Sequence, residues 1–300
     1  MREQTKGTLL TVLSGILFGM SPLFAMAIYD GGSNAMTLSV HRMLLGALCL
    51  GAVQIFFVKD SLKITKQELK KTAVCALGFG LTPILLCTSY NYLSTGLCTT
   101  IHYVYPVLVL LGCLLFFKDG LTVKKGICCL LCVCGILCFY TPGGQTQLKG
   151  ILLALCSGCT YAFYIIFLDK SGLVEMDTFK LGFWLNAVSA VEVTAIALIS
   201  GQLTFRLSGQ AWGATVLYAG VILSVGVIAF QKGVQYIGAQ NGALLSTLEP
   251  LTSVVLGILC FHEAFTLRSA VGIVCILLSV ILLSVGGTET TDPKVKQSGT

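Results

Sequence analysis

The sequence predicts an all-α polytopic membrane protein with ten transmembrane helices in two inverted five-helix repeats. Three observations lead to this prediction. The 300 residues are 55% hydrophobic and only 11% charged, whereas a soluble domain has about 25% charged residues. Ten apolar segments follow one another with short polar connectors between them. The first half of the chain also matches the second half at a shift of 143 to 144 residues.

The ten apolar segments are about as long as a helix that crosses ~30 Å of hydrocarbon. They are residues 7–27, 36–58, 72–92, 96–117, 122–140, 149–168, 178–199, 211–231, 240–261 and 267–286. The connectors at 29–34 and 141–147 are rich in glycine, and the connector at 59–71 is rich in lysine. Residues 288–300 are polar, and we expect a disordered cytoplasmic tail there.

Ten spans place both termini on one side of the membrane. That side receives fourteen Lys and Arg residues and the other side three, when Arg42 and Lys180 are left out because they lie within segments. The positive-inside rule therefore predicts a multi-pass cell-membrane protein with both termini in the cytoplasm. It also explains the net charge of +6 without a nucleic-acid partner. The expected partners are the lipid bilayer and a small-molecule substrate, and the expected state is a monomer or weak homo-oligomer.

The internal match defines two repeat units, residues 1–143 and 144–287. The matched positions are Lys6-Gly7 with Lys149-Gly150, Ser14-Gly15 with Ser157-Gly158, Tyr92 with Tyr236, Pro106 with Pro250, and Phe117 with Phe261. Because each unit holds an odd number of spans, the second unit is inverted relative to the first. The first segment has the charge and apolar pattern of a signal peptide. It corresponds to the internal sixth segment, so we expect it to be retained as a helix.

Glu249 lies near the middle of the ninth segment, and Pro250 follows it directly. A charged side chain at that depth costs ~2.5–3.5 kcal/mol, so the carboxyl group is expected to face a cavity rather than lipid. Pro250 has no N–H and is expected to kink the helix, leaving a carbonyl one turn back without its usual donor. The alternative is a structural carboxylate bonded to a neighbouring hydroxyl.

The fourth segment corresponds to the ninth, with His102 matching Ser246 and Tyr105 matching Glu249. His102 and Tyr105 are three residues apart and share a helix face. Pro106 places a second kink at the matching depth. If the two helices meet at the pseudo-symmetry axis, these four side chains form one site. A buried carboxyl group beside a histidine suits a proton-linked site, and a static Glu–His or Glu–Tyr bond is the alternative.

Arg42 and Glu192 are weaker candidates in the second and seventh segments. Arg42 would offer a cation to a substrate carboxylate, or extend its charge to the membrane surface. Glu192 would line the cavity or pair with Arg42. The remaining candidates are aromatic and amide side chains that would line a cavity: Tyr90, Asn91, Tyr161, Tyr164, Gln231 and Gln235.

The sequence contains no motif of a soluble-type catalytic site or nucleotide-binding loop. We therefore expect neither an enzyme nor a primary pump, and no cofactor. Fourteen cysteines lie mostly in apolar segments, and five crowd the fifth segment without a histidine or acid nearby. They are expected to be small packing residues rather than metal ligands.

Two stretches, HYVYPVLVLLGCLLFFKDGLT and LSTLEPLTSVVLGILCFHEAFT, resemble the EamA family of the drug/metabolite transporter superfamily. The resemblance extends over residues 7–286. The residues that match the family pattern are Arg42, Glu249-Pro250, Asp119 with Thr122, and Glu263 with Thr266. Lys118 and His262 depart from it, since the family often has glycine there. The couples Lys118-Asp119 and His262-Glu263 are expected to act as end caps or gate-closing charges.

The resemblance implies a membrane carrier of amino acids, other metabolites, drugs or sugar nucleotides, often acting outward and against protons. It also implies a cavity between segments 1, 3, 4, 6, 8 and 9. Together with the inverted repeat, this leads us to expect a secondary-active exporter of a small metabolite such as an amino acid. The open alternatives are a multidrug or other cationic-compound exporter, a membrane enzyme, and a non-transporting membrane subunit.

Overall fold

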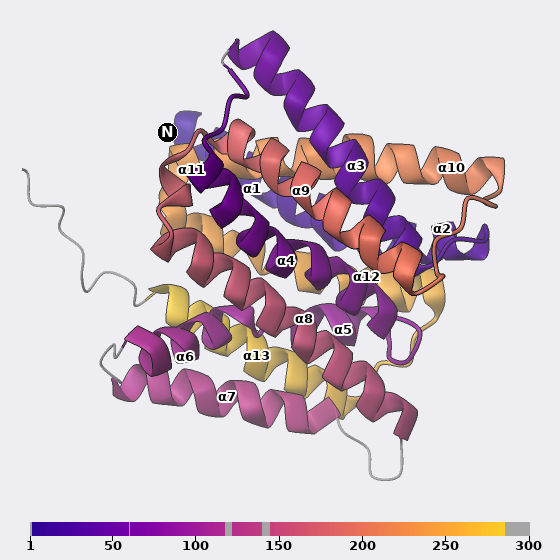
Figure 1. Ribbon diagram of the computed structural model, residues 1–300. Coiled ribbons are helices and arrows are strands. Elements are labelled where there is room, and N and C mark those ends of the chain that lie inside the picture. The colour runs from indigo at the N-terminus through magenta and orange to yellow at the C-terminus, as the bar shows by residue number, and fades with distance from the viewer. Residues whose placement is uncertain (1, 60, 118–121, 140–144, 286–300) are drawn as a thin grey trace, which may run out of the picture.

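The computed structural model describes residues 2–59, 61–117, 122–139 and 145–285 as a bundle of helices (Figure 1). No strand occurs in these ranges. The predicted all-α membrane class is confirmed, because eight helical stretches of the described chain are long and apolar enough to cross a membrane. They are Glu3–Asp30, Ala35–Val58, Lys66–Ser89, Thr95–Phe117, Gln147–Lys170, Thr178–Ile199, Gly209–Gly238 and Leu267–Ser284. The count of ten spans stays a prediction.

The first half of the chain contains α1 (Arg2–Gly19), α2 (Ser21–Asp30), α3 (Ala35–Val53), the π-helical turn η1 (Gln54–Val58), α4 (Lys66–Ser89), α5 (Thr95–His102), α6 (Tyr105–Phe117) and α7 (Val123–Phe139). The second half contains α8 (Gln145–Lys170), the 3-10 turn η2 (Leu173–Glu175), α9 (Thr178–Ile199), α10 (Gly209–Thr215), the π-helical turn η3 (Val216–Ile222), α11 (Leu223–Ser246), α12 (Leu248–Phe261) and α13 (Leu267–Val285). Lys118, Asp119, the boundary between residues 143 and 144, and the tail at 288–300 lie outside the described residues.

Two helices are interrupted at matching positions, as the prolines predict. α5 ends at His102 and α6 begins at Tyr105, while α11 ends at Ser246 and α12 begins at Leu248. The ninth segment is therefore not one continuous helix, and Glu249 is the second residue of α12. α11 also bends at Gly238, whose backbone angles are φ 81° and ψ 159°. Only glycine adopts that conformation readily, so this residue separates the eighth segment from the ninth.

Side-chain caps start several helices at the end of the bundle that bears the lysine-rich connector. Thr65 and Glu68 form a capping box at the start of α4, and Asp177 accepts the amides of Phe179 and Lys180 at the start of α9. The same end is joined across the chain, since Lys71 Nζ donates to the Ser171 carbonyl at 2.6 Å. The starts of α4 and α9 and the end of α8 thus lie together.

Small residues let the helices approach closely. α7 packs along α13, α3 along α9, and α4 against both α8 and α9. A Cβ on Gly135 would lie 2.8 Å from the Gly272 carbonyl oxygen, so these two glycines set the α7–α13 distance. Cys132 Sγ donates to Ser279 Oγ at 3.3 Å in the same contact, and Ser279 Oγ donates to the Cys128 carbonyl at 2.7 Å. Cys128 and Cys132 of the fifth segment are therefore packing residues, as predicted, whereas Cys134 is exposed.

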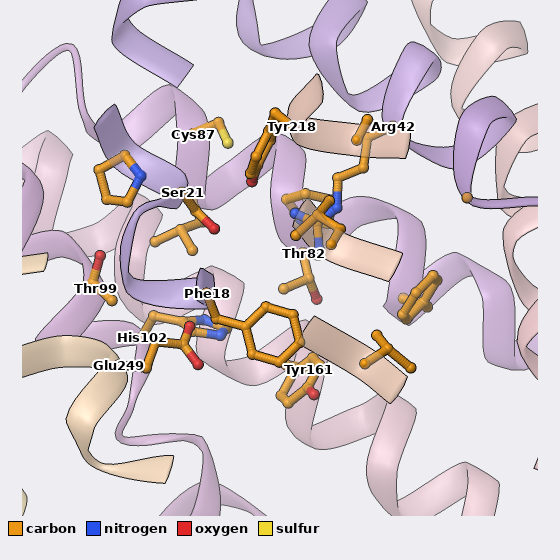
Figure 2. A pocket seen from close by; sticks show the side chains of 18 of the residues that line it. Phe18, Ser21, Arg42, Thr82, Cys87, Thr99, His102, Tyr161, Tyr218 and Glu249 are labelled. Atoms are coloured by element: carbon orange, nitrogen blue, oxygen red, sulfur yellow. The ribbon is translucent and has the colours of Figure 1, made fainter. Parts of the chain in front are cut away.

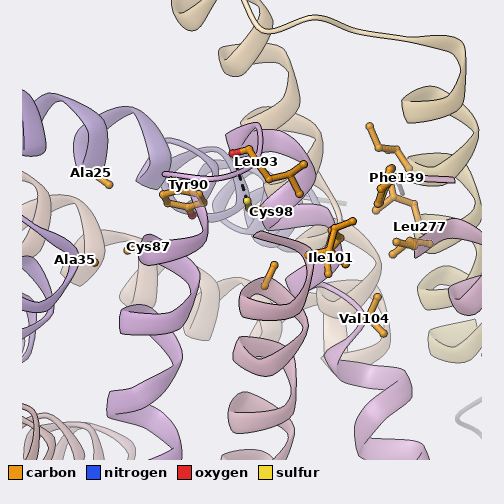
Figure 3. Close-up of a cluster of buried hydrophobic side chains, with 14 of the residues drawn as sticks. Ala25, Ala35, Cys87, Tyr90, Leu93, Cys98, Ile101, Val104, Phe139 and Leu277 are labelled. Carbon is orange, nitrogen blue, oxygen red and sulfur yellow. Dashed lines mark hydrogen bonds between the residues drawn. The ribbon is translucent and has the colours of Figure 1, made fainter. Parts of the chain in front are cut away.

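Apolar side chains fill the interior and also cover the outside of the bundle. Figure 3 shows a buried cluster in which Cys98 donates a long thiol hydrogen bond, 3.6 Å, to the Leu93 carbonyl. On the outside, Phe57, Ile199 and Leu267 are more than 80% exposed. Apolar groups exposed to this extent fit contact with lipid, not with water.

Candidate functional site

Two adjoining chambers lie between the helices at the centre of the bundle. The deeper chamber has a volume of about 240 Å³ and reaches Arg42, Tyr90 and Tyr218. The second has a volume of about 430 Å³ and extends to Met176 and Thr178, at the end with the lysine-rich connector. Both chambers share walls, formed by Phe18, Leu50, Phe79, Tyr103, Tyr105, Tyr161, Asn186, Val227 and Glu249. Of the four residues on which the sequence analysis centred, Tyr105 and Glu249 lie in the shared wall, while His102 lines the deeper chamber and Ser246 the second.

Glu249 is held next to the interruption between α11 and α12. Pro250 has no N–H, so the carbonyl four residues earlier, that of Ser246, has no helical donor. Tyr103 supplies one, because its hydroxyl donates to the Ser246 carbonyl at 2.6 Å. The same hydroxyl lies 3.5 Å from Glu249 Oε2, at the outer limit of a hydrogen bond. The carbonyl that Pro250 leaves without its helical donor therefore accepts a hydrogen bond from the opposite half of the chain.

His102 is bonded to α8, and no hydrogen bond joins it to Glu249 among the described residues. Its Nδ1 lies 2.9 Å from Ser157 Oγ. Ser157 donates its single hydroxyl proton to the Ala154 carbonyl at 2.6 Å, so its oxygen accepts from Nδ1–H. This bond fixes the orientation of the His102 ring. His102 lines the deeper chamber, and its other ring nitrogen, Nε2, takes no part in this bond.

Aromatic rings surround one side of Glu249. Tyr105 and Tyr161 meet edge to face with centroids 4.7 Å apart, a favourable arrangement for aromatic pairs. Tyr161 also lies 5.4 Å from His102 and 5.4 Å from Tyr164, and Tyr103 lies 5.5 Å from Tyr105. These contacts join α5, α6 and α8 into one rigid aromatic wall.

Arg42 enters the deeper chamber from α3, and Figure 2 shows it on the far side of the hollow from Glu249. No ion pair within 4 Å joins Arg42 to Glu249 or to Glu192 in the described part of the chain. The cavity therefore presents a cation and a carboxyl group that do not neutralise each other by direct contact. A solute with both charges would satisfy the two groups at once.

The structure brings most of the predicted residues together. Arg42, Tyr90, His102, Tyr105, Tyr161 and Glu249 line the deeper chamber, and Tyr164, Gln231 and Ser246 line the second. Glu192 lines neither chamber, and its Oε2 is buried without a hydrogen-bond partner. Asn91 and Gln235 are exposed and also lie outside both chambers.

Sequence analysis missed Tyr103, Tyr218 and Phe18. Tyr103 lies inside the quoted HYVY stretch, and its position at the first interruption, opposite Thr247 in the repeat, was the available signal. Tyr218 lies in η3, is 1% exposed and stacks on Phe24 with centroids 5.5 Å apart. No local pattern marks Tyr218 or Phe18, because only helix packing brings them to the cavity.

A bundle of long apolar helices around a polar and aromatic cavity defines a multi-span membrane protein with a solute-sized internal site. The EamA-like transporter family matches residues 5–141 and again residues 148–285. The chain therefore belongs to the EamA-like transporter family, and the resemblance found in the sequence is confirmed.

Relatives with the same extent support this assignment. The chain is 28% identical to the uncharacterized transporter YvbV of Bacillus subtilis, over 94% of this chain and 92% of that protein. It is 26% identical to the uncharacterized inner membrane transporter YicL of Salmonella typhimurium, over 95% of this chain and 97% of that protein. A solved crystal structure with 14% sequence identity has the same fold, with a TM-score of 0.64 over 93% of this chain and 98% of the other.

Proposed function

We propose that this protein is a secondary-active exporter that moves a small zwitterionic metabolite, such as an amino acid, by alternating access. The observation on which this proposal depends is the pair of opposite charges, Arg42 and Glu249, in one cavity without a direct ion pair between them. Arg42 would bind a carboxylate through its planar guanidinium. Glu249 would bind the ammonium group, and the tyrosine wall would contact the rest of the solute.

A second candidate is an exporter of drugs or other cationic compounds. The aromatic rings around Glu249 favour it, because tyrosine faces attract cations, and a carboxylate among them strengthens that preference. In this case Arg42 would take no part in binding the solute. The two candidates therefore differ in what each predicts for Arg42.

The packing supports an inverted repeat as the basis of alternating access. α1 packs on α11, and α8 packs on α4. Each contact joins the first segment of one half to the third segment of the other half. The contact of α12 with α1 matches that of α6 with α8, and α3–α9 and α7–α13 pair corresponding helices. A pseudo-two-fold axis between the halves accounts for all of these pairs. If the two halves exchanged their conformations, the cavity would open at the opposite end of the bundle.

Proton coupling at Glu249 completes the proposal. Glu249 is a carboxyl group in the cavity, and its negative charge can be removed by a proton or balanced by an ammonium group. Competition between the two for one site would make solute and proton move in opposite directions. By the lysine distribution, the second chamber extends toward the predicted cytoplasmic end, which is the end from which an exporter would take up its solute.

The test is binding to the purified protein, measured as ligand-dependent thermal stabilisation. A panel of amino acids is compared with matched amines that lack the carboxylate. For a zwitterion site, both Glu249→Gln and Arg42→Gln abolish stabilisation. For a cation site, only Glu249→Gln does so. Glu192→Gln and Arg206→Gln are the controls, since neither residue lines the chambers. Absence of stabilisation by every compound would argue for a non-transporting subunit.

A further inference from the structure

The hydroxyl group of Tyr103 faces two acceptors and has a single proton. It donates to the Ser246 carbonyl at 2.6 Å, and Glu249 Oε2 lies 3.5 Å from the same oxygen atom. A phenol donates one strong hydrogen bond at a time. The two acceptors therefore compete for Tyr103, and the present geometry favours the carbonyl.

The Ser246 carbonyl and the Glu249 carboxyl group differ in when they attract a hydrogen-bond donor. The Ser246 carbonyl accepts the Tyr103 hydroxyl in place of the helical donor that Pro250 cannot supply, and this does not change with protonation. Glu249 needs a donor only while it is an unpaired carboxylate, and a charge-assisted hydrogen bond is then about twice as strong as a neutral one. A proton or a bound ammonium group on Glu249 removes that demand. Whether Glu249 holds a proton or an ammonium group thus determines which of the two acceptors receives the Tyr103 hydrogen bond.

We propose that Tyr103 is a positioning residue that links the charge on Glu249 to the helix interruption before α12. With Glu249 neutralised, Tyr103 holds the Ser246 carbonyl and fixes the interruption. With Glu249 charged and unpaired, Tyr103 turns to the carboxylate, and the Ser246 carbonyl loses the hydrogen bond from Tyr103. This inference rests on the proposed function, in which Glu249 exchanges a proton or an amine.

Because of the position of Tyr103, a change of its hydrogen-bond acceptor would affect how the two halves of the chain are held together. Tyr103 lies at the interruption between α5 and α6, and its bond reaches the matching interruption between α11 and α12. The bond therefore joins the two halves of the chain at the cavity. Its release would let α12 shift against α5 and α6, which is the kind of movement that alternating access requires.

Other ionisable groups face Glu249, and none of them makes the same pair of contacts among the described residues. Those that line the two chambers from neighbouring elements are Arg42 on α3, Cys87 on α4, Tyr90 after α4, His102 on α5, Tyr105 on α6, Tyr161 and Tyr164 on α8, and Tyr218 on η3. Tyr161 is the best matched control. It is a tyrosine of the same wall, and no hydrogen bond joins it to Ser246 or Glu249.

Amide hydrogen exchange of the full-length protein in lipid nanodiscs tests the link, read at residues 247–249. Rates are corrected for the intrinsic effect of pH with a peptide from α7. We expect exchange in the wild type to be about three- to tenfold faster with Glu249 charged than in Glu249→Gln, the effect of losing one hydrogen bond. In Tyr103→Phe, exchange is fast and Glu249→Gln no longer slows it. Tyr161→Phe keeps the wild-type difference.

A second variant separates the hydrogen bond from the charge. Glu249→Asp keeps the carboxylate but draws it back from Tyr103, so exchange is expected to be as slow as in Glu249→Gln. The inference is wrong if Tyr103→Phe retains the Glu249→Gln effect, or if Glu249→Asp exchanges as fast as the wild type. These readouts need no substrate. Failure of the ligand-binding test with the exchange pattern intact would overturn the proposed function alone.

Discussion

At the scale of single residues, the site depends on which group replaces the hydrogen bond that Pro250 cannot donate. Pro250 opens a gap in the backbone hydrogen bonding beside Glu249, and Tyr103 from the other half of the chain fills it. His102 is held by Ser157 instead, on a different helix. The carboxyl group is therefore left to face the cavity, where a solute or a proton can reach it.

Glu249→Gln is expected to abolish accumulation of solute driven by a pH gradient, together with the binding of solute at the cavity. Glutamine keeps the size of the side chain, but it can neither release a proton nor carry the negative charge that would bind an ammonium group, so coupling and binding are lost together. Uptake into proteoliposomes with and without a pH gradient measures this. Transport unchanged in Glu249→Gln at every pH between about 5 and 8, where histidines and buried carboxyl groups titrate, would contradict the coupling role.

At the scale of elements, the two ends of the bundle are joined differently. At the end away from the lysine-rich connector, Glu263 Oε1 accepts the Thr95 amide at 2.6 Å and the Thr95 hydroxyl at 2.8 Å. This Glu263–Thr95 contact caps α5 from the connector after α12, so the expected role of Glu263 as an end cap is confirmed. It lies at the end of the bundle opposite the second chamber.

Glu263→Ala is expected to speed amide exchange in the first turn of α5 about five- to tenfold, because a lost helix cap costs about 1 kcal/mol or somewhat more. Glu263→Gln is the control, since its amide oxygen can still accept from Thr95. Hydrogen exchange followed by mass spectrometry reports the difference. Equal exchange in the two variants would show that the contact does not hold α5.

Gly135→Val is expected to destabilise the α7–α13 contact by about 1–3 kcal/mol through overpacking. The added side chain would meet the Gly272 carbonyl and Ile276. Gly126→Val is a matched control in the same helix, because a Cβ there has nothing within 4 Å. Thermal unfolding followed by scanning fluorimetry should show a lower midpoint for Gly135→Val only. A similar midpoint in both variants would mean that helix propensity, not packing, sets the cost.

At the scale of the whole molecule, the two halves interlock across their boundary. α1 of the first half packs on α11 and α12, and α8 of the second half packs on α4, α5 and α6. The cavity is therefore built from both halves, and neither half would enclose it alone. The family match to residues 5–141 and 148–285 follows the same division.

Peptide tags inserted after Gly172 and after Gly201 test the orientation. Both glycines have positive φ, and a Cβ at either would have nothing within 4 Å, so the two insertions are matched in their local setting. The lysine distribution predicts a cytoplasmic tag after Gly172 and an external tag after Gly201. Antibody access to right-side-out membrane vesicles, before and after permeabilisation, measures both. Access to the Gly172 tag in sealed vesicles would invert the predicted topology.

The sequence by itself determined the all-helical membrane class, the interruptions before Pro106 and Pro250, and the cavity position of Glu249. These features depend on local chemistry, since hydrocarbon excludes unpaired charge and proline lacks an N–H. Only the tertiary structure decided that Tyr103 reaches Ser246, that Tyr218 and Phe18 line the cavity, and that Glu192 does not. Helices that are apolar on all sides have no sequence signal for which face turns inward. Close packing at residues such as Gly135 and Gly272 sets how each helix is rotated, and that is a property of the assembled bundle.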